Sequence, residues 1–216
     1  QDTPFRYPLA KLVVFQQLSA RYAEADDLNS SVAMLDEAIK IAQTLPTQAR
    51  RDNAMVSLLC ERADRMNDLG EDLEGLKVLS QAQALIDAGA SVEVDARAEC
   101  LAVRSYLSSA LGQHAQAVDA AREAIRVLES GGVTAGAGVV GYMSALDRAL
   151  LLAGRHTEAW PLAEKNFNDT VASEGLNSMG ALRLANRLSH LKLVGGQPLE
   201  ALALSQRDLA LMEQLM

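Results

Sequence analysis

The chain has 216 residues, of which 49% are hydrophobic and only 4% aromatic, and its 20 basic and 28 acidic side chains give a formal net charge of −8. This acidity argues against direct binding to nucleic acid or anionic lipid, and no apolar run approaches the roughly 20 residues that a membrane-spanning helix needs. The shortage of aromatic residues also disfavours a β-sandwich or barrel, so the composition indicates an Ala- and Leu-rich helical protein.

Turn residues recur at a constant interval along the chain. Gly70, Gly112, Gly154 and Gly196 are spaced by 42 residues, and Asp26 stands in the same place 44 residues before Gly70. Small residues recur seven positions before these turns and five or twelve positions after them, as closely packed antiparallel helices require. Clear examples are Ser19, Ala63, Ser105, Ser189, Ala38, Ala82, Ala117, Ala124, Ala159 and Ala201.

The spacing of apolar residues then predicts ten helices in five pairs. The first helices of the pairs are expected at 8–24, 48–68, 92–110, 138–153 and 177–194, and the second helices at 28–44, 72–87, 114–129, 156–172 and 198–215. Pro161 lies inside one of these second helices, which predicts a late start or a kink there. The pairs belong to repeats at about 8–46, 47–90, 91–132, 133–174 and 175–216, which together form a single domain over 1–216.

With Ser105, Gly112, Ala117 and Ala124 at these offsets, the chain resembles the tetratricopeptide-type helical repeats. The long period resembles the variants in kinesin light chains, maltose-activator-type regulators and repeat regions fused to bacterial Ser/Thr kinases. The resemblance implies a right-handed α-solenoid whose first helices line a concave groove. The Lys and Asn set with which chaperone-binding members hold a C-terminal carboxylate is absent, because the corresponding positions carry Gln16, Gln17, Ala20, Cys60 and Glu61.

The resemblance places a set of mostly polar side chains in that groove. They are Glu61, Asp64, Asn67, Asp68, Glu99, Tyr106, Arg148, Arg183, Asn186, Arg187 and His190. Residues 61–74 hold six acids and two bases, whereas 176–195 hold Arg183, Arg187 and Lys192 and no acid. This distribution predicts a groove with an acidic N-terminal half and a basic C-terminal end, which would suit an extended peptide. The alternative is that both runs are ordinary solvated helix faces.

No residue pattern points to catalysis, a metal or a cofactor. Cys60 and Cys100 lack metal-ligand spacing, and we expect them to be small buried residues on two helices without a disulfide. His114, His156 and His190 are dispersed along the chain. Gly136–Gly141 matches GxGxxG, but it follows no predicted strand, so the stretch is interpreted as an inter-repeat loop leading into a helix.

These observations predict a non-enzymatic protein-interaction scaffold that binds a peptide or a partner helix. The alternative is a regulatory sensor domain of a bacterial signalling protein, either a kinase or a transcriptional regulator, that binds a peptide or small ligand. Trp160 is expected in the core, with a role as partner anchor as the alternative. The last helix ends in apolar residues, so a homo-oligomer through that helix is also open; these residues are Leu209, Leu211, Met212, Leu215 and Met216.

The chain begins with Gln1 instead of Met, which leads us to expect a fragment of a larger protein or a processed product. We expect a cytoplasmic location, with an exported mature form as the alternative.

Overall fold

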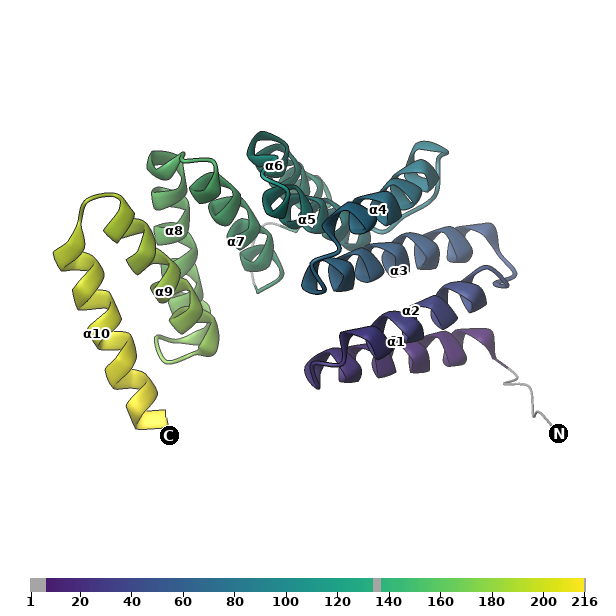
Figure 1. Ribbon diagram of the computed structural model, residues 1–216, viewed down its shortest axis with the longest axis horizontal. Coiled ribbons are helices and arrows are strands. Elements are labelled where there is room, and N and C mark those ends of the chain that lie inside the picture. The colour runs from purple at the N-terminus through teal and green to yellow at the C-terminus, as the bar shows by residue number, and fades with distance from the viewer. Residues whose placement is uncertain (1–6, 134–136, 216) are drawn as a thin grey trace. The chain divides into compact units, whose positions relative to one another are not determined.

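The computed structural model describes residues 7–133 and 137–215, with side-chain surroundings at all of these except 137–140, 179 and 211–215. These residues form ten α-helices and no strand (Figure 1), which confirms the all-α fold class. In chain order the helices are α1 Pro8–Glu24, α2 Leu28–Ala42, α3 Gln48–Asp68, α4 Asp72–Asp87, α5 Val94–Ala110, α6 His114–Ser130, α7 Ala137–Leu152, α8 His156–Glu174, α9 Met179–Val194 and α10 Pro198–Leu215.

The turn residues determine where the first helices end. Asp26 and the four equivalent glycines all lie in the left-handed region, with φ between 61° at Asp26 and 80° at Gly196. The next N–H then reaches back to the carbonyl five residues earlier, as from Glu71 N to Met66 O at 2.8 Å. This is the Schellman motif, which satisfies two otherwise unpaired carbonyls and stops the helix. The predicted boundaries therefore agree with the structure to within two residues.

The small residues at the repeated offsets let each pair of helices pack closely. They are buried seven residues before the turn, at Ser19, Ala63, Ser105 and Ser189, and after it, at Ala38, Ala82, Ala117, Ala124, Ala159 and Ala201. Gly75 shows how little room is left, since a Cβ there would lie 3.2 Å from the Ala63 carbonyl oxygen of the paired α3 and 2.8 Å from a methyl carbon of Leu107 on α5. In the fourth and fifth repeats, buried Asn166 and Asp208 replace the later alanine.

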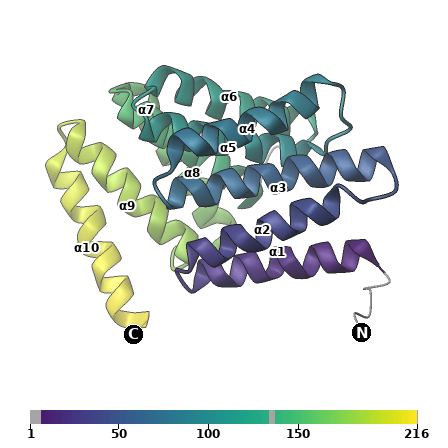
Figure 2. The ribbon, with the colours of Figure 1, turned by 45° about the vertical axis from the view of Figure 1, so that its right-hand side comes forward.

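The chain divides into two compact units at Gln113, within the turn between α5 and α6. In the first unit α2 packs between α1 and α3, and α5 packs against both α3 and α4 (Figures 1 and 2). One apolar cluster, with Leu35 and Leu58 at its centre, joins α1, α2 and α3, and a second, around Val78 and Leu107, joins α3, α4 and α5.

In the second unit each helix packs on the next one from α6 to α10. Figure 2 shows α9 and α10 side by side. None of the described helices is long and apolar enough to cross a membrane.

Pro161 does not delay the start of its helix, contrary to one of the two expectations. α8 begins at His156 and continues through Pro161 to Glu174. A proline within a helix has no N–H to donate, so the carbonyl four residues before it, that of Thr157, loses its usual helical partner. The early position in α8 limits this loss to the first turns, where packing against α7 and α9 supports the helix.

Candidate functional site

Acidic side chains from two neighbouring helices of the first unit lie close together. Glu61, Asp64 and Asp68 are spaced by three and four residues, so they lie on one face of α3. Glu99 on α5 is near enough to interact electrostatically with both Glu61 and Asp64. We call Glu61, Asp64, Asp68 and Glu99 the acidic face. The structure therefore brings together four of the residues predicted to contact a partner.

Only weak or shared partners neutralise this face within the described residues. Arg65 is a neighbouring cation, and its Nη1 lies 3.1 Å from an Asp64 oxygen and 3.2 Å from an Asp68 oxygen. Gln16 of α1 donates a long hydrogen bond of 3.4 Å to Glu61. One guanidinium is thus shared between two carboxylates, and in the described part of the chain the other two acids have no ion pair of comparable length.

Crowding raises the pKa of three of these carboxyl groups. For Glu61 and Asp64 the main cause is the loss of surrounding water, and neighbouring carboxylates add to it. The pKa of Glu99 is raised for the same reasons, although its side chain is exposed, because the protein around it displaces solvent and Glu61 and Asp64 repel its charge. A negative charge is therefore held on this face at an energetic cost, which a cationic ligand would relieve.

A disulfide joins the two helices directly behind the acidic face, and the expectation of unpaired cysteines is wrong. Cys60 on α3 is bonded to Cys100 on α5, with their Cα atoms 5.0 Å apart. Both cysteines are buried, as expected. Cys60 precedes Glu61 and Cys100 follows Glu99, so the cross-link fixes the two backbones beside these acids. The sequence signal was one cysteine in each of two successive first helices, ten residues before Gly70 and twelve before Gly112, because such helices lie side by side.

The remaining predicted residues of the first unit lie at the edge of this arrangement. Tyr106 is on the same side of α5 as Glu99, seven residues further along the helix, and is half-buried. Asn67 is also half-buried, but at about 100° per residue it points about a quarter of a turn away from the centre of the acidic face.

In the second unit, the predicted residues of α9 share one side of that helix. Arg183, Asn186 and His190 are exposed, whereas Arg187 is half-buried and reaches to α7. There Arg187 forms an ion pair with the buried Asp147 and donates to the carbonyl oxygen of Ser144. Arg187 thus has a structural partner that a count of charges along α9 does not reveal.

Lys192, a second cation of the predicted basic end, also has partners within the chain. Lys192 is buried, donates to Glu200 of α10 at 2.6 Å, and lies 4.6 Å from the ring centre of Trp160. Trp160 therefore packs between successive repeats, against the end of α9. Arg148 of α7 is exposed. The basic end is consequently smaller than predicted, with Arg183 as its exposed cation on α9.

Asp147 is the most perturbed acid of the second unit. Its side chain is completely buried, and this burial raises its pKa to about 6 against the opposing effect of Arg187. One carboxylate oxygen has no hydrogen-bond partner. Asn166 and Thr170 of α8 also carry buried polar atoms without partners. Asn166 stands where the first three repeats carry alanine, and Asp147 stands where the others carry serine or alanine, so the interior of the second unit is more polar at these positions.

The described part of the chain offers no metal centre. Within residues 7–133 and 137–215 no three His, Cys, Asp or Glu side chains gather as metal ligands would. His114 and His156 are each the first residue of a helix, α6 and α8. The GxGxxG match begins at Gly136, which lies outside the described residues, and α7 starts at Ala137.

Comparison with known proteins identifies the fold. No family model and no curated protein matches the sequence. A kinesin light chain-like protein from Podosopora anserina with nearly identical TPR-like repeats is 19% identical, with a TM-score of 0.73 over 98% of this chain and 99% of that one. BtubC (BKLC) from P. vanneervenii is 16% identical, with a TM-score of 0.73 over 88% of this chain and 75% of that one.

A Rap protein, crystallised with competence and sporulation factor, is 12% identical, with a TM-score of 0.75 over 95% of this chain and 55% of that one. The fold is tetratricopeptide-like. The TPR-like repeats of the kinesin light chain-like protein agree with the recurring helix pairs of this chain.

The TPR-like fold explains why the acidic residues meet. First helices of successive TPR-like repeats lie side by side, here α3 and α5, so residues about 40 positions apart become neighbours. Glu61, Asp64, Asp68 and Glu99 thus give this part of the fold a negative charge.

Proposed function

We propose that this chain is a non-enzymatic protein-interaction module whose acidic face binds an extended basic segment of a partner protein. The observation that carries the proposal is the set of carboxylates at 61, 64, 68 and 99 around a single shared arginine. Opposite charge on a partner would steer its approach and fix its register. Among the proteins of similar fold, the Rap protein was crystallised with competence and sporulation factor.

The raised pKa values of Glu61, Asp64 and Glu99 support a cationic ligand in particular. A lysine or arginine side chain placed among them would favour their ionised forms and lower these pKa values. Binding would therefore release protons, and affinity should rise with pH while the three groups titrate.

The disulfide supports the same proposal through rigidity. Because it cross-links α3 and α5 next to Glu61 and Glu99, these two carboxylates need little rearrangement when a partner binds. A site that is ordered before binding loses less conformational entropy in the complex.

The test uses a fluorescein-labelled twelve-residue peptide of alternating lysine and serine, titrated with the full chain and followed by anisotropy. The triple variant Glu61→Lys, Asp64→Lys and Glu99→Lys should weaken binding by at least about tenfold, since exposed charge pairs contribute up to about 1 kcal/mol each.

The matched control is Glu71→Lys, Glu74→Lys and Asp87→Lys. It makes the same change in net charge at exposed positions on and beside α4. The control should bind nearly as well as the wild type. Equal losses in both variants would show that only net charge matters, and no loss in either would remove the acidic face from the proposal.

The exposed side of α9 is proposed as a second contact, for acidic groups of the partner. Arg183, Asn186 and His190 carry this part of the proposal. Arg183→Glu tests it without disturbing the interior, whereas Arg187→Glu would also leave the buried Asp147 unpaired. If Arg183→Glu leaves the affinity for a partner protein unchanged, α9 does not take part in recognition.

A regulatory sensor domain of a bacterial signalling protein is the second candidate, because the matched Rap structure holds competence and sporulation factor. In that case the ligand would alter the shape of the chain as well as bind to it. Small-angle X-ray scattering separates the two functions: a scaffold keeps its radius of gyration when the lysine–serine peptide is added, and a sensor changes it.

We also propose that the chain works in an oxidising compartment. Disulfides persist in secreted and periplasmic proteins and are rare in the cytosol, so the Cys60–Cys100 bond favours the exported alternative over a cytoplasmic location. Rapid alkylation of intact cells that produce the protein tests this. Protected, unalkylated cysteines are expected, and two alkylated cysteines would place the chain in a reducing compartment.

A further inference from the structure

Asp147 on α7 stands at a packing position where other repeats carry a hydroxyl. It lies seven residues before the turn residue of its repeat, like Ser19 and Ser189, and all three side chains are buried. The Ser19 hydroxyl bonds to the Ser31 hydroxyl of α2 at 2.8 Å. Ser189 donates to the Ala201 carbonyl oxygen of α10, also at 2.8 Å. In these two repeats the polar group therefore has a partner on the second helix of its own pair.

The partner of Asp147 comes from the next repeat instead. Ala159, the equivalent of Ser31 on α8, has no polar side chain. One carboxylate oxygen of Asp147 pairs with Arg187 of α9, and the other has no hydrogen-bond partner, although the side chain is completely buried. A buried carboxylate keeps its charge only where partners stabilise it. Within the described residues, one arginine thus balances the charge of Asp147.

Arg187 belongs to the side of α9 that carries exposed polar residues, but its guanidinium reaches to α7. It lies four residues after Arg183 and three before His190, so these three residues share one side of the helix. Its side chain is still 31% exposed, and it also donates to the Ser144 carbonyl oxygen. The guanidinium can therefore move into water without unfolding of the helix. Its release from Asp147 would place a further cation between Arg183 and His190.

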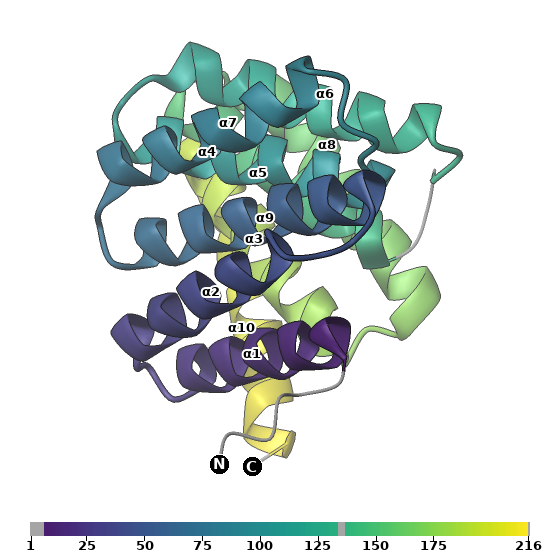
Figure 3. The same ribbon diagram turned by 90° about the vertical axis from the view of Figure 1, so that its right-hand side faces the viewer.

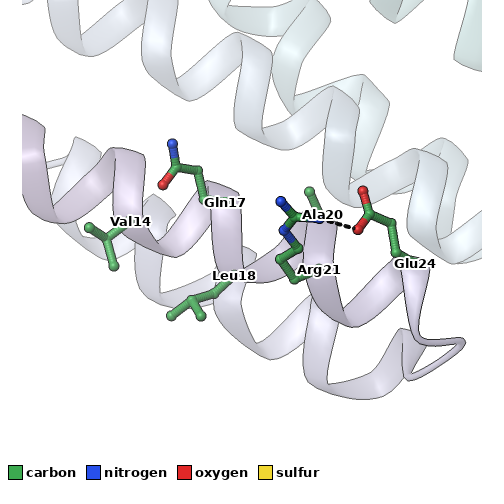
Figure 4. A pocket seen from close by; sticks show the side chains of 6 residues that line it. All are labelled: Val14, Gln17, Leu18, Ala20, Arg21 and Glu24. Atoms are coloured by element: carbon green, nitrogen blue, oxygen red, sulfur yellow. Dashed lines mark hydrogen bonds and ion pairs between the residues drawn. The ribbon is translucent and has the colours of Figure 1, made fainter.

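An ion pair at the surface shows why the burial of Asp147 matters. Arg21 and Glu24 lie on α1, the outermost helix of the first unit (Figures 1 and 3), and are 2.7 Å apart. Figure 4 shows this contact beside a shallow hollow. The two side chains are 79% and 64% exposed, so water solvates each charge with or without the other. Asp147 has no exposed part, and its charge depends on Arg187.

Protonation would remove the charge that holds Arg187. Burial raises the pKa of Asp147 to about 6, against the opposing effects of Arg187 and of the backbone N–H of Arg148. The carboxyl group is therefore mostly neutral below about pH 6 and mostly ionised above it. A neutral carboxyl group attracts a guanidinium much less than a carboxylate does.

Other charged groups of the helices around α7 have partners or lie at the surface. On α6 and α8 they pair with one another, as Arg122 with Glu158, Arg126 with Glu123 and Lys165 with Asp169. His114 and His156 are the first residues of these two helices. On α9, Lys192 pairs with Glu200 of α10, and Arg183 and His190 are exposed. Of the charged groups in the described parts of α6, α8 and α9, Arg187 is the one that acts on Asp147.

We propose that Asp147 is a proton-controlled switch: its charge keeps Arg187 away from the exposed side of α9, and its protonation makes this guanidinium available to an anionic group of a partner. The inference rests on the contact of α9 with acidic groups proposed above, and it adds the regulation of that contact. Arg183 carries the contact while Asp147 is ionised. Arg183 and Arg187, one helical turn apart, carry it together once Asp147 is protonated.

The test uses a rhodamine-labelled twelve-residue peptide of alternating cysteic acid and serine, because sulfonates keep their charge as the pH changes. Anisotropy titrations with the full chain are compared at about pH 7.5 and about pH 5, on either side of the titration of Asp147. The wild type should bind more tightly at the lower pH. Asp147→Asn should bind about fivefold more tightly than the wild type at about pH 7.5, as one added exposed charge pair allows. This advantage should disappear at about pH 5, where Asp147 of the wild type is protonated as well.

Two matched variants isolate the switch. Glu24→Gln makes the same change in net charge beside Arg21 and should bind like the wild type at both pH values. The addition of Arg187→Gln to Asp147→Asn leaves no buried charge unpaired and should abolish the gain in affinity. NMR relaxation of the Arg187 Cζ reports the release directly. This side chain should be ordered in the wild type at about pH 7.5, and mobile at about pH 5 and in Asp147→Asn.

An Arg187 side chain that is equally ordered at both pH values would overturn the proposal. Equal affinities of Asp147→Asn and the wild type at about pH 7.5 would overturn it too, because release would then add no contact. Failure of the α9 contact itself is recognised separately, by Arg183→Glu in the Asp147→Asn background. If that variant leaves the affinity unchanged, the peptide binds elsewhere and both proposals are wrong, even where Arg187 becomes mobile as expected.

Discussion

Reduction of the Cys60–Cys100 disulfide should destabilise the first unit strongly. The bond joins residues 40 positions apart. If a disulfide stabilises chiefly by restricting the unfolded chain, closing a loop of that size removes about 4 kcal/mol of conformational entropy from the unfolded state. For a chain of this length, 1 kcal/mol corresponds to roughly 2 to 4 °C. We therefore expect the melting temperature to fall by roughly 10 °C.

The assay is thermal unfolding followed by circular dichroism, with and without dithiothreitol. The double variant Cys60→Ala and Cys100→Ala should melt near the reduced wild type and should not respond to the reductant. A thiol count of the unfolded, unreduced protein should find no free cysteine. Two free thiols in the untreated protein, or a melting temperature that reduction leaves unchanged, would refute this reasoning.

Three further variants test the turns, the polar interior and the close packing. Gly70→Ala should lower the free energy of unfolding by about 1 to 2 kcal/mol because φ is 75° at this residue, a conformation that side chains disfavour. Asp26→Gly, at φ 61°, should raise the free energy of unfolding, and urea unfolding measures both changes. Burial raises the pKa of Asp147 to about 6, so between pH 4 and 6 this carboxyl group is protonated in the folded state but ionised in the unfolded state. The free energy of unfolding should therefore fall by up to about 3 kcal/mol as pH rises from 4 to 7. Asp147→Asn should flatten that dependence on pH, and an unchanged slope in this variant would show that Asp147 does not cause it. Gly75→Val should cost about 1 to 3 kcal/mol through overlap with Leu107; an unaltered urea midpoint would contradict the close packing there.

The sequence predicts the helices well because their ends are determined locally. At each turn one residue adopts the left-handed backbone conformation, and the next N–H donates to the carbonyl five residues earlier. This local motif ends each first helix at the turn residue of its repeat. Even Asp26, which breaks the glycine pattern, adopts this conformation. The small residues on either side are equally local signals of close packing.

The errors at the candidate site come from contacts between repeats. Arg187 forms an ion pair with Asp147, 40 positions earlier in the chain, and Cys60 is bonded to Cys100 at the same separation. A charge count along one helix cannot register a partner on the next repeat. The acidic residues were easier to place, because Glu61, Asp64 and Asp68 follow one another on a single helix. Cys60 stands ten residues before Gly70 and Cys100 twelve before Gly112, so a comparison of equal offsets in neighbouring repeats misses the pair, and only one that allows a shift of two positions would have revealed it.

The most direct test of the proposed function is to map where the lysine–serine peptide binds. Amide chemical shifts of the isotope-labelled chain should be recorded during the titration. We predict that the largest changes cluster on α3 and α5, around Glu61, Asp64 and Glu99, and that they disappear in the triple lysine variant. Changes centred on α2 and α4, or spread evenly over all acidic side chains, would contradict the assignment of the acidic face as a binding surface.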